Sequence, residues 1–331
     1  MAKFGIRLLD DVGMPRDLVA MGVEAETLGY DSVWYPHDTF RLNSWVLTSA
    51  TAQATERVQI FARTNLYTTD PCEIATYIAT LDWLSNGRAN LSIGLHTTDM
   101  LSWLGINDVD VQRRTRETTE IVRRLLKGEV VAYHGAEFNW TEKAFLRFKP
   151  LREEVPIYVC PFGESYLELS GELGDGSLPM VAPPDSAQVL IEPILRGARK
   201  AGRDPKELDI VAFVWISVSE DGSQTKEQMK DVAAYFGHYL DRPALATIDL
   251  TPEDFVPVLR HVLAGDMPGA RALVTDNMLN LGIHGTPEEC IRQLERVVEA
   301  GATHISLGGP MGPNPREAVR LIARRVLPYF R

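Results

Sequence analysis

Short apolar segments alternate with longer amphipathic segments along most of the chain. The first apolar segment, residues 3–9, precedes a segment at 15–29 where apolar side chains recur at helical spacing from Leu18 to Leu28, with Gly29 as a stop signal. The same succession of a strand-like and a helix-like segment occurs eight times. The eight apolar segments are residues 3–9, 31–35, 57–63, 88–95, 155–161, 176–182, 208–219 and 304–310.

This alternation predicts a parallel sheet covered by helices, and eight repeats favour a closed (β/α)8 TIM barrel over an open sheet. The barrel itself needs about 250 residues, so a chain of 331 residues is expected to carry insertions. One is a hairpin near 128–148, before the fifth strand, and the other is a helix-rich addition near 241–303. Because the sequence has no solenoid repeat, low-complexity tract or Pro/Gly linker, we predict a single domain over 1–331.

Composition narrows the possible function classes. The net charge of −11 argues against a broad nucleic-acid-binding surface. The three cysteines are far apart and odd in number, which fits a reducing cytoplasm and suggests neither disulfides nor a metal site. The sequence has no signal-peptide pattern, no stretch of roughly 18 apolar residues and no nucleotide-binding, zinc-protease or serine-hydrolase motif. We expect a cytoplasmic protein that binds no membrane, nucleic acid or metal and acts on a small molecule.

Candidate chemistry lies where the predicted strands end, because active sites of such barrels lie at the C-terminal ends of the strands. After the fourth strand comes GLHTTDMLSWLGI, residues 94–106, which changes from apolar to four consecutive polar side chains. Polar residues also follow the second strand and complete the third. The candidates at these three strand ends are His37, Asp38, Arg63, Thr64, Asn65, His96, Thr97, Thr98 and Asp99.

Several of these residues have more than one interpretation. Residues 163–165 follow the fifth strand at a predicted helix start, where backbone N–H groups could bind a phosphate or simply form a helix cap. The His37–Asp38 pair could be catalytic or could merely close a strand, and Arg63 could anchor a ligand or form a salt bridge. Aromatic residues of the predicted helices, such as Trp83 and Tyr235, fall at core spacing and need no cofactor to explain them.

Seven stretches spread over the chain carry a resemblance to a known family. They are LGYDSVWYPHD at 28–38, TNLYTTDPCEIA at 64–75, NGRANLSIGL at 86–95, LLKGEVVAYHGAEF at 125–138, YLELSGELGDGSLP at 166–179, ALVTDNMLNLGIHGTPEE at 272–289 and GGPMGPNPREAVRLIARRVLPYF at 308–330. In this order they resemble the bacterial luciferase-like flavin and deazaflavin oxidoreductases. Within that superfamily the chain is most similar to the methylenetetrahydromethanopterin reductase type, which uses coenzyme F420.

The resemblance implies a barrel in which the cofactor ring lies across the C-terminal ends of the strands. It implies a non-proline cis peptide or bulge at Ala62–Arg63, pressing on the ring, and places Thr64 and Asn65 at the ring edge. Gly163, Glu164 and Ser165 would receive the phosphate of the cofactor. Asp99 would donate or accept a proton as the charge on the ring changes during hydride transfer.

Two stretches depart from the pattern of the family. The order His37–Asp38 is the reverse of the usual Asp-His, and His96, Thr97 and Thr98 stand where relatives commonly have Gly-Ala-Gly. These bulkier side chains would narrow the pocket or contact the cofactor themselves, which favours a substrate other than methanopterin. We expect the pair at 37–38 and Asp99 to be catalytic.

The leading hypothesis is an F420-dependent oxidoreductase that transfers a hydride between the deazaflavin and a small organic substrate. The resemblance also implies a homodimer. Its nearest rival is an FMN-dependent luciferase-like monooxygenase, in which FMN would take the place of F420. A second rival is a catalytically silent barrel that binds a flavin-like ligand or a partner subunit. A cofactor-free aldolase is disfavoured, because no candidate Schiff-base lysine stands at a predicted strand end.

Overall fold

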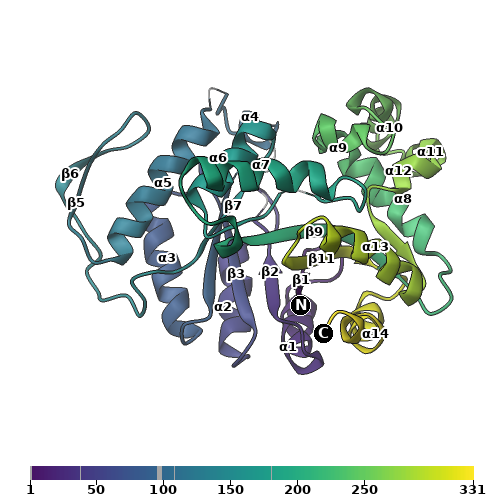
Figure 1. Cartoon of the computed structure of the whole chain (residues 1–331), viewed down its shortest axis with the longest axis horizontal. Helices are drawn as coiled ribbons and strands as arrows, with labels where there is room; N and C mark the ends of the chain where they lie inside the picture. The colour runs from purple at the N-terminus through teal and green to yellow at the C-terminus, as the bar shows by residue number, and fades with distance from the viewer. Residues whose placement is uncertain (1, 38, 95–98, 108, 180) are drawn as a thin grey trace.

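Eight parallel strands close into a barrel at the centre of the described chain, which confirms the predicted (β/α)8 TIM barrel (Figure 1). The computed structural model describes residues 2–37, 39–94, 99–107, 109–179 and 181–331. The barrel strands are β1 (Lys3–Arg7), β2 (Ser32–Tyr35), β3 (Gln59–Asn65), β4 (Ala89–Gly94), β7 (Ile157–Cys160), β8 (Gly176–Ser177), β9 (Asp209–Val218) and β11 (His304–Met311). Each strand pairs with the next in this order, and β11 also pairs with β1, which closes the ring.

Helices connect the barrel strands and cover the outside of the ring. They are α1 (Pro15–Leu28), α2 (Ser44–Gln53), α3 (Pro71–Leu84), α5 (Val111–Leu126), α6 (Glu164–Leu173), α7 (Ala187–Lys200), α8 (Thr225–Phe236) and α14 (Pro315–Arg325). Local sequence explains their ends: Pro15 starts α1 and Gly29 ends it in the left-handed region at φ 88°. Asp70 caps α3 by accepting a hydrogen bond from the Cys72 backbone N–H. Among the helices of the described chain, none is both long and apolar enough to cross a membrane.

Two additions lie outside the strand–helix units. The strands β5 (Val131–His134) and β6 (Asn139–Ala144) form an antiparallel hairpin, which stands away from the barrel at the left of Figure 1. Glu117 of α5 anchors this hairpin, because its carboxylate accepts hydrogen bonds from three successive backbone N–H groups at 2.9, 3.0 and 3.1 Å. The second addition, before β11, comprises α9 (Arg242–Ala246), α10 (Val256–Leu263), α11 (Met267–Leu273), α12 (Asp276–Leu279), β10 (Ile283–Gly285) and α13 (Pro287–Glu299). Short 3-10 helices lie at Pro205–Glu207, Gly237–Tyr239, Pro252–Phe255 and Leu327–Tyr329.

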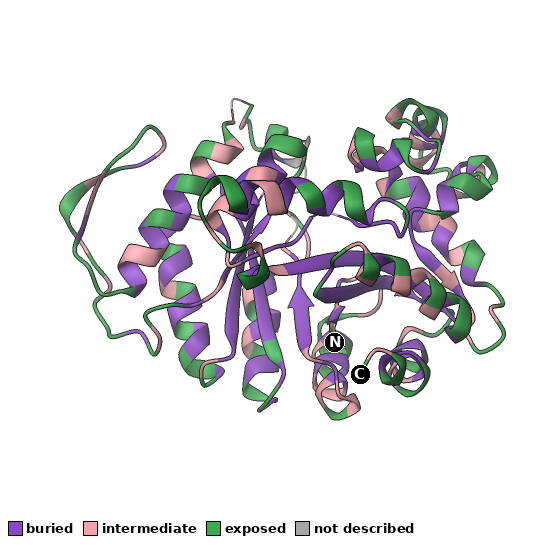
Figure 2. Cartoon of the chain, viewed as in Figure 1, coloured by how far each residue is buried: buried purple, intermediate pink, exposed green. Residues whose placement is uncertain are grey.

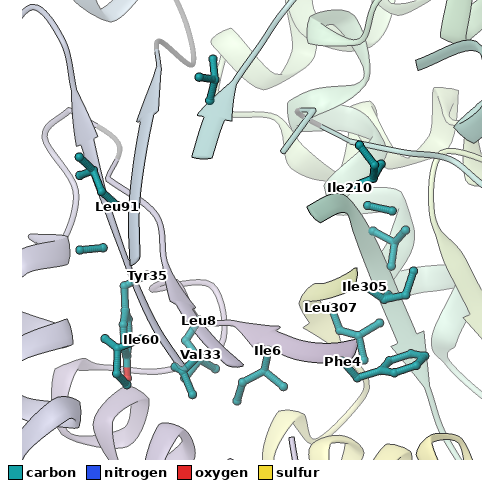
Figure 3. Packing of buried hydrophobic residues seen from close by; sticks show 14 of the residues in the cluster. Phe4, Ile6, Leu8, Val33, Tyr35, Ile60, Leu91, Ile210, Ile305 and Leu307 are labelled. Carbon is teal, nitrogen blue, oxygen red and sulfur yellow. The ribbon is translucent and has the colours of Figure 1, made fainter. Parts of the chain in front are cut away.

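The outer layer of the core lies between the strands and the helices. Successive side chains of a strand point to opposite faces, so every second strand residue can pack against a helix. Figure 3 shows such residues on five strands, namely Ile6, Val33, Ile60, Leu91 and Ile305, all buried. In Figure 2 most of the length of the barrel strands is accordingly coloured as buried, whereas the helices present exposed residues outward.

The inner layer of the core fills the barrel lumen with aromatic side chains. Trp34 of β2 stacks on Phe61 of β3 with the ring centroids 3.5 Å apart, and Tyr158 of β7 packs edge-on against both rings. Gly5 of β1 provides the room for this packing, because a Cβ atom there would lie 2.0 Å from the Oγ atom of Ser32. The part of the lumen around these three rings is therefore filled by side chains.

A polar network lies at the N-terminal end of the lumen. His304 Nδ1 lies 3.1 Å from the Asp209 carboxylate, and its Nε2 lies 2.8 Å from the Ser32 hydroxyl. The Trp34 indole N–H donates to the same hydroxyl at 2.7 Å, and the Tyr158 hydroxyl donates to Asp209 at 2.8 Å. Because Ser32 and His304 are 0% and 2% exposed, this Ser–His–Asp arrangement is part of the core, out of reach of a substrate.

Candidate active site

The C-terminal ends of the barrel strands, with the loops that follow them, form one end of the barrel, which we term the barrel mouth. His37 lies two residues after the end of β2 and is half-buried, and residues 63–65 complete β3. Asp99 is the first residue of the short helix α4 (Asp99–Ser102), and its side chain lies outside the described part of the chain. The expectations for Asp38, His96, Thr97 and Thr98 also fall outside the described residues.

The side chains at the end of β3 differ in what they contact. Arg63 is 5% exposed. Thr64 donates a hydrogen bond to the Thr69 hydroxyl at 3.1 Å. Asn65 donates from its amide to the Thr39 hydroxyl at 3.2 Å, and its carbonyl oxygen accepts a backbone N–H two residues later. These contacts leave the Thr64 hydroxyl able to accept a hydrogen bond and leave the Asn65 amide with a second N–H donor, so both side chains can still bind a ring edge.

The implied cis peptide or bulge at Ala62–Arg63 is wrong for this structure. The ladder between β3 and β4 keeps a regular register over residues 60–65, and the cis peptide bond of the described chain is Gly309–Pro310. Both polar groups of the Ala62–Arg63 peptide have partners: the carbonyl accepts from the Ser92 hydroxyl at 3.3 Å, and the N–H donates to the Ser44 hydroxyl at 3.1 Å. A trans peptide meets both partners without interrupting the ladder.

Two arginines lie at the end of the lumen that faces the barrel mouth. Arg7, the last residue of β1, lies over the Phe213 ring with 4.3 Å between its Cζ and the ring centroid. Burial raises the pKa of the Cys160 thiol at the end of β7, while the charges of Arg63 and Arg7 act in the opposite direction. Gly94 of β4 lets the strands approach here, because a Cβ at its φ of 158° would lie 2.5 Å from the Cys160 carbonyl oxygen. The end of the lumen that faces the barrel mouth therefore combines positive charge with tight packing.

The expected phosphate site lies at the start of α6. Gly163 precedes the helix at φ 85°, and the first N–H groups of a helix have no partner within it. Asp241, just before α9, accepts a hydrogen bond from the Gly163 N–H, and burial raises the pKa of Asp241 to about 6 despite this bond. Ser165 accepts a hydrogen bond from a side-chain amide of α5 at 2.8 Å, and Glu164 pairs with an arginine of α7 at 2.6 Å. An internal carboxylate therefore lies beside the expected anion site.

A cleft of about 710 Å³ is lined by the loops after β1, β2 and β11 and by helices α8 and α11. Asp11 and Arg41 line it on the barrel side, and Tyr235 and Phe236 form an aromatic wall on α8. Arg271 of α11 contributes a cation that pairs with a carboxylate of α8 at 2.5 Å. The cleft thus offers apolar surface together with both signs of charge.

Sequence reasoning missed the part of the mouth that follows β1. Partial desolvation raises the pKa of Asp11, while the nearby charges of Arg7 and Arg41 act to lower it. A signal was present, because the first predicted strand ends in two acidic residues, Asp10 and Asp11, just as the second and fourth end in polar side chains.

The expected burial of Trp83 and Tyr235 is wrong. Their exposed fractions are 52% and 47%, and Tyr235 lines the cleft. Helical spacing places both near the buried face of their helices, but the neighbouring segments of the described chain leave about half of each side chain exposed. A side chain at the edge of an apolar face is buried only if another element lies against that edge, which periodicity does not reveal.

Comparison with known proteins agrees with this geometry. The family model described as luciferase-like monooxygenase matches residues 2–304. The 5,10-methylenetetrahydromethanopterin reductase of Archaeoglobus fulgidus is 31% identical over 336 residues, covering 99% of this chain and 100% of the relative. The structure of the coenzyme F420-dependent tetrahydromethanopterin reductase from Methanopyrus kandleri matches with a TM-score of 0.93 at 26% identity, over 100% of this chain and 99% of that one.

A more distant match has the same fold with another cofactor. The oxygenating constituent of 3,6-diketocamphane monooxygenase from Pseudomonas putida, solved in complex with FMN, matches with a TM-score of 0.73 at 18% identity, over 99% of both chains. At this identity the match supports the fold alone. The family model, which spans more than nine-tenths of the sequence, and the full-length relative lead to one conclusion: the chain belongs to the luciferase-like monooxygenase family.

Proposed function

We propose that this chain is a coenzyme F420-dependent oxidoreductase that transfers a hydride between the deazaflavin and a small organic substrate. The observation that carries the proposal is the match over the full length, at a TM-score of 0.93, to a coenzyme F420-dependent reductase. The 31% identity to a second reductase of the same type supports it. The FMN-containing neighbour shares the fold at only 18% identity, so an FMN-dependent monooxygenase is the weaker candidate.

The barrel mouth offers groups that fit a phosphate-bearing deazaflavin. Arg63 supplies a buried positive charge, and backbone N–H groups at the start of α6 suit a phosphate. The ring edge would meet the Thr64 and Asn65 side chains, which keep a free acceptor and a free N–H donor beside their bonds within the chain. The residues that we propose to contact the cofactor are Ala62, Arg63, Thr64, Asn65, His96, Thr97, Thr98, Gly163, Glu164 and Ser165.

The protein would position the reactants and handle one proton. When bound, the cofactor supplies the two-electron hydride chemistry. A C–H bond breaks on the donor and one forms on the acceptor, and the change in charge is balanced by a proton. We propose that Asp99 donates or accepts this proton and that His37 and Asp38, at the end of β2, take part in the same step.

We propose that the cleft beside the barrel mouth holds the substrate. Its aromatic wall, Tyr235 and Phe236, suits flat or apolar carbon groups, and Asp11 and Arg41 offer polar contacts on the barrel side. Residues 96–98 are bulkier than the Gly-Ala-Gly common among the reductases that the chain resembles. We therefore expect a substrate other than methylenetetrahydromethanopterin.

We also propose that the protein is a homodimer. Large apolar side chains are exposed on the neighbouring helices α2 and α3, including Val46, Tyr77 and Leu84. Trp83 of α3 is also half exposed, and its indole N–H donates to the Lys149 carbonyl at 3.0 Å. Exposed apolar surface of this kind is typical of a protein–protein interface.

A binding titration tests the choice of cofactor. We expect micromolar binding of F420, followed by fluorescence, and no comparable binding of FMN. Asp99→Asn should bind F420 within about threefold of the wild type but lose about 100-fold or more in turnover, because a general acid or base contributes that much. Binding of FMN without F420 would contradict the proposal, and F420 binding with no turnover of any test substrate would favour a silent barrel.

A further inference from the structure

Arg63 is a buried cation in β3 that forms no ion pair with a described carboxylate. The residue is 5% exposed, and its neighbours in the strand, Ala62 and Thr64, are fully buried. In the described part of the chain no carboxylate forms an ion pair with its guanidinium, although most other buried or half-buried arginines have such a partner or several carbonyl partners. The charge of Arg63 is therefore not balanced by a described acidic group.

The Arg63 side chain lies on the lumen side of β3. Side chains alternate along a strand, so Arg63 shares a face with Phe61, whose ring stacks on Trp34 inside the barrel. Arg63 is two residues closer to the C-terminal end of the strand than Phe61, which puts it above this aromatic layer and next to the barrel mouth. The charge acts on the Cys160 thiol at the end of β7, which places the guanidinium within electrostatic range of that strand end.

Among the described residues, the groups that interact electrostatically with Arg63 carry no negative charge near neutral pH. Arg7 of β1 is a second cation that acts on the same thiol. Burial raises the pKa values of Cys160 and of Tyr166 in α6, so both are uncharged near neutral pH. Burying a charge without a counter-charge is strongly unfavourable, because the desolvation of the ion is not compensated. Such a residue is stabilised when an anionic or strongly polar ligand group enters the mouth.

We propose that Arg63 is the electrostatic partner of the bound deazaflavin ring and stabilises the ring in its anionic form. The inference rests on the proposed function, because it takes F420 as the ligand at the barrel mouth. The ring carries ionisable groups, and hydride transfer changes its charge by one unit. A fixed cation at the edge of a packed lumen acts through a low dielectric, so its effect on the ring exceeds that of an exposed arginine.

The ionisation of bound F420 provides a direct test that does not depend on turnover. The absorbance of F420 bound to the protein is followed as a function of pH, which reports the pKa of the bound ring. An opposite charge within about 4–6 Å lowers the pKa of an acid by roughly one to three units. We expect the ring pKa to be at least about one unit higher in Arg63→Met than in the wild type, because the side-chain length is kept and the charge is lost.

Two variants provide the controls. Arg63→Lys keeps the charge and should leave the ring pKa within about half a unit of the wild type. Arg57→Met removes an exposed arginine before β3, at the opposite end of the barrel, and should change nothing. If Arg63→Met does not fold, as judged by circular dichroism, Arg63→Gln replaces it. Loss of F420 binding in a folded Arg63→Met with binding kept in Arg63→Lys would also support the proposal.

Two results would overturn the inference. An unchanged ring pKa in Arg63→Met would make Arg63 an ion-pair partner within the chain, and loss of binding in both Arg63→Met and Arg63→Lys would mean that charge is not what the site requires. Failure of the proposed function looks different, because the wild-type protein itself would then bind no F420.

Discussion

At the scale of single residues, Asp209 makes more side-chain hydrogen bonds and ion pairs than any candidate residue that the structure describes at the barrel mouth. Its carboxylate accepts hydrogen bonds from the hydroxyls of Tyr158 and Thr303 at 2.8 and 2.9 Å and lies 3.1 Å from His304 Nδ1 and 3.3 Å from Lys3 Nζ. Burial alone would raise the pKa of Asp209, but His304 and Lys3 together hold it well below the ordinary value. The ionised carboxylate of β9 therefore interacts with side chains at the N-terminal ends of β1, β7 and β11.

Asp209→Asn should destabilise the fold by about 3 kcal/mol or more at pH 7, because it breaks a buried charged network. Since the folded-state pKa lies below the unfolded value of 3.8, the contribution of Asp209 is present above about pH 4 and is lost as the pH falls further. Urea unfolding at pH 7 and pH 3 measures both effects, and the deficit of the variant should shrink at pH 3.

Lys3→Met is the matched control for Asp209. Lys3 is mostly exposed and makes one contact to the same carboxylate, so its removal should cost less than about 1 kcal/mol. Equal losses in the two variants would contradict the view that buried hydrogen bonds, more than surface charge, hold this network together.

At the scale of elements, the start of α6, where we propose that the phosphate binds, also contacts the loop before α9. Asp241 bonds to the Gly163 N–H and has a pKa raised to about 6 by burial. Its ionised form therefore places a negative charge beside the N–H groups that would hold the phosphate of a cofactor. The α8–α9 connection, although far from α6 in sequence, sets the charge at this helix terminus.

Asp241→Asn should strengthen F420 binding several-fold at pH 7.5, because it removes a like charge from the phosphate site. It should also raise stability at pH 7.5, by at most about 3 kcal/mol for a shift of roughly two units. Because the folded-state pKa is raised, the favourable contribution of Asp241 is full below about pH 4 and is lost as the pH rises through 6. Calorimetry for binding and urea unfolding at pH 4 and 7.5 test these effects.

An exposed carboxylate supplies the comparison for Asp241. Glu207→Gln, in a surface 3-10 helix, should alter neither binding nor the pH dependence of stability. Weaker F420 binding in Asp241→Asn would show that Asp241 orders the start of α6 and does not compete with the ligand.

At the scale of the whole molecule, the exposed apolar side chains of α2 and α3 predict self-association. Val46 of α2 is 68% exposed, so Val46→Glu would bury a charge in the dimer and should yield monomers in analytical ultracentrifugation. Leu263→Glu, at a residue that is 79% exposed on α10, should leave the dimer intact. A monomeric wild type, or a dimer lost only in Leu263→Glu, would contradict the proposed interface.

Much of the architecture was predictable from local pattern. The eight apolar segments correspond to the eight barrel strands, and the helix over 15–28 with Gly29 after it follows from spacing and a stop signal. These features depend on residues close together in sequence. The expected location of chemistry at strand ends also needed only the order of elements, since parallel strands bring their C-terminal ends to one side.

The contents of the mouth were less predictable. Arg63 was a candidate from the sequence, but its burial among Arg7 and Cys160 depends on β1, β3 and β7 meeting around the lumen. Asp241 was not found, because its contact with Gly163 joins residues 78 positions apart, and no local pattern marks it. The regular trans ladder at Ala62–Arg63 likewise reflects partners on α2 and β4.

The sequence by itself determined the order of strands and helices, the closed barrel and the end of it that carries polar side chains, because hydrophobic periodicity and helix stop signals act within a few residues. Only the tertiary structure decided which charges face one another and which apolar side chains stay exposed. Burial and electrostatic interactions depend on distances between elements that are remote in the chain, so Arg63 and Asp241 acquire their significance only once the barrel has closed.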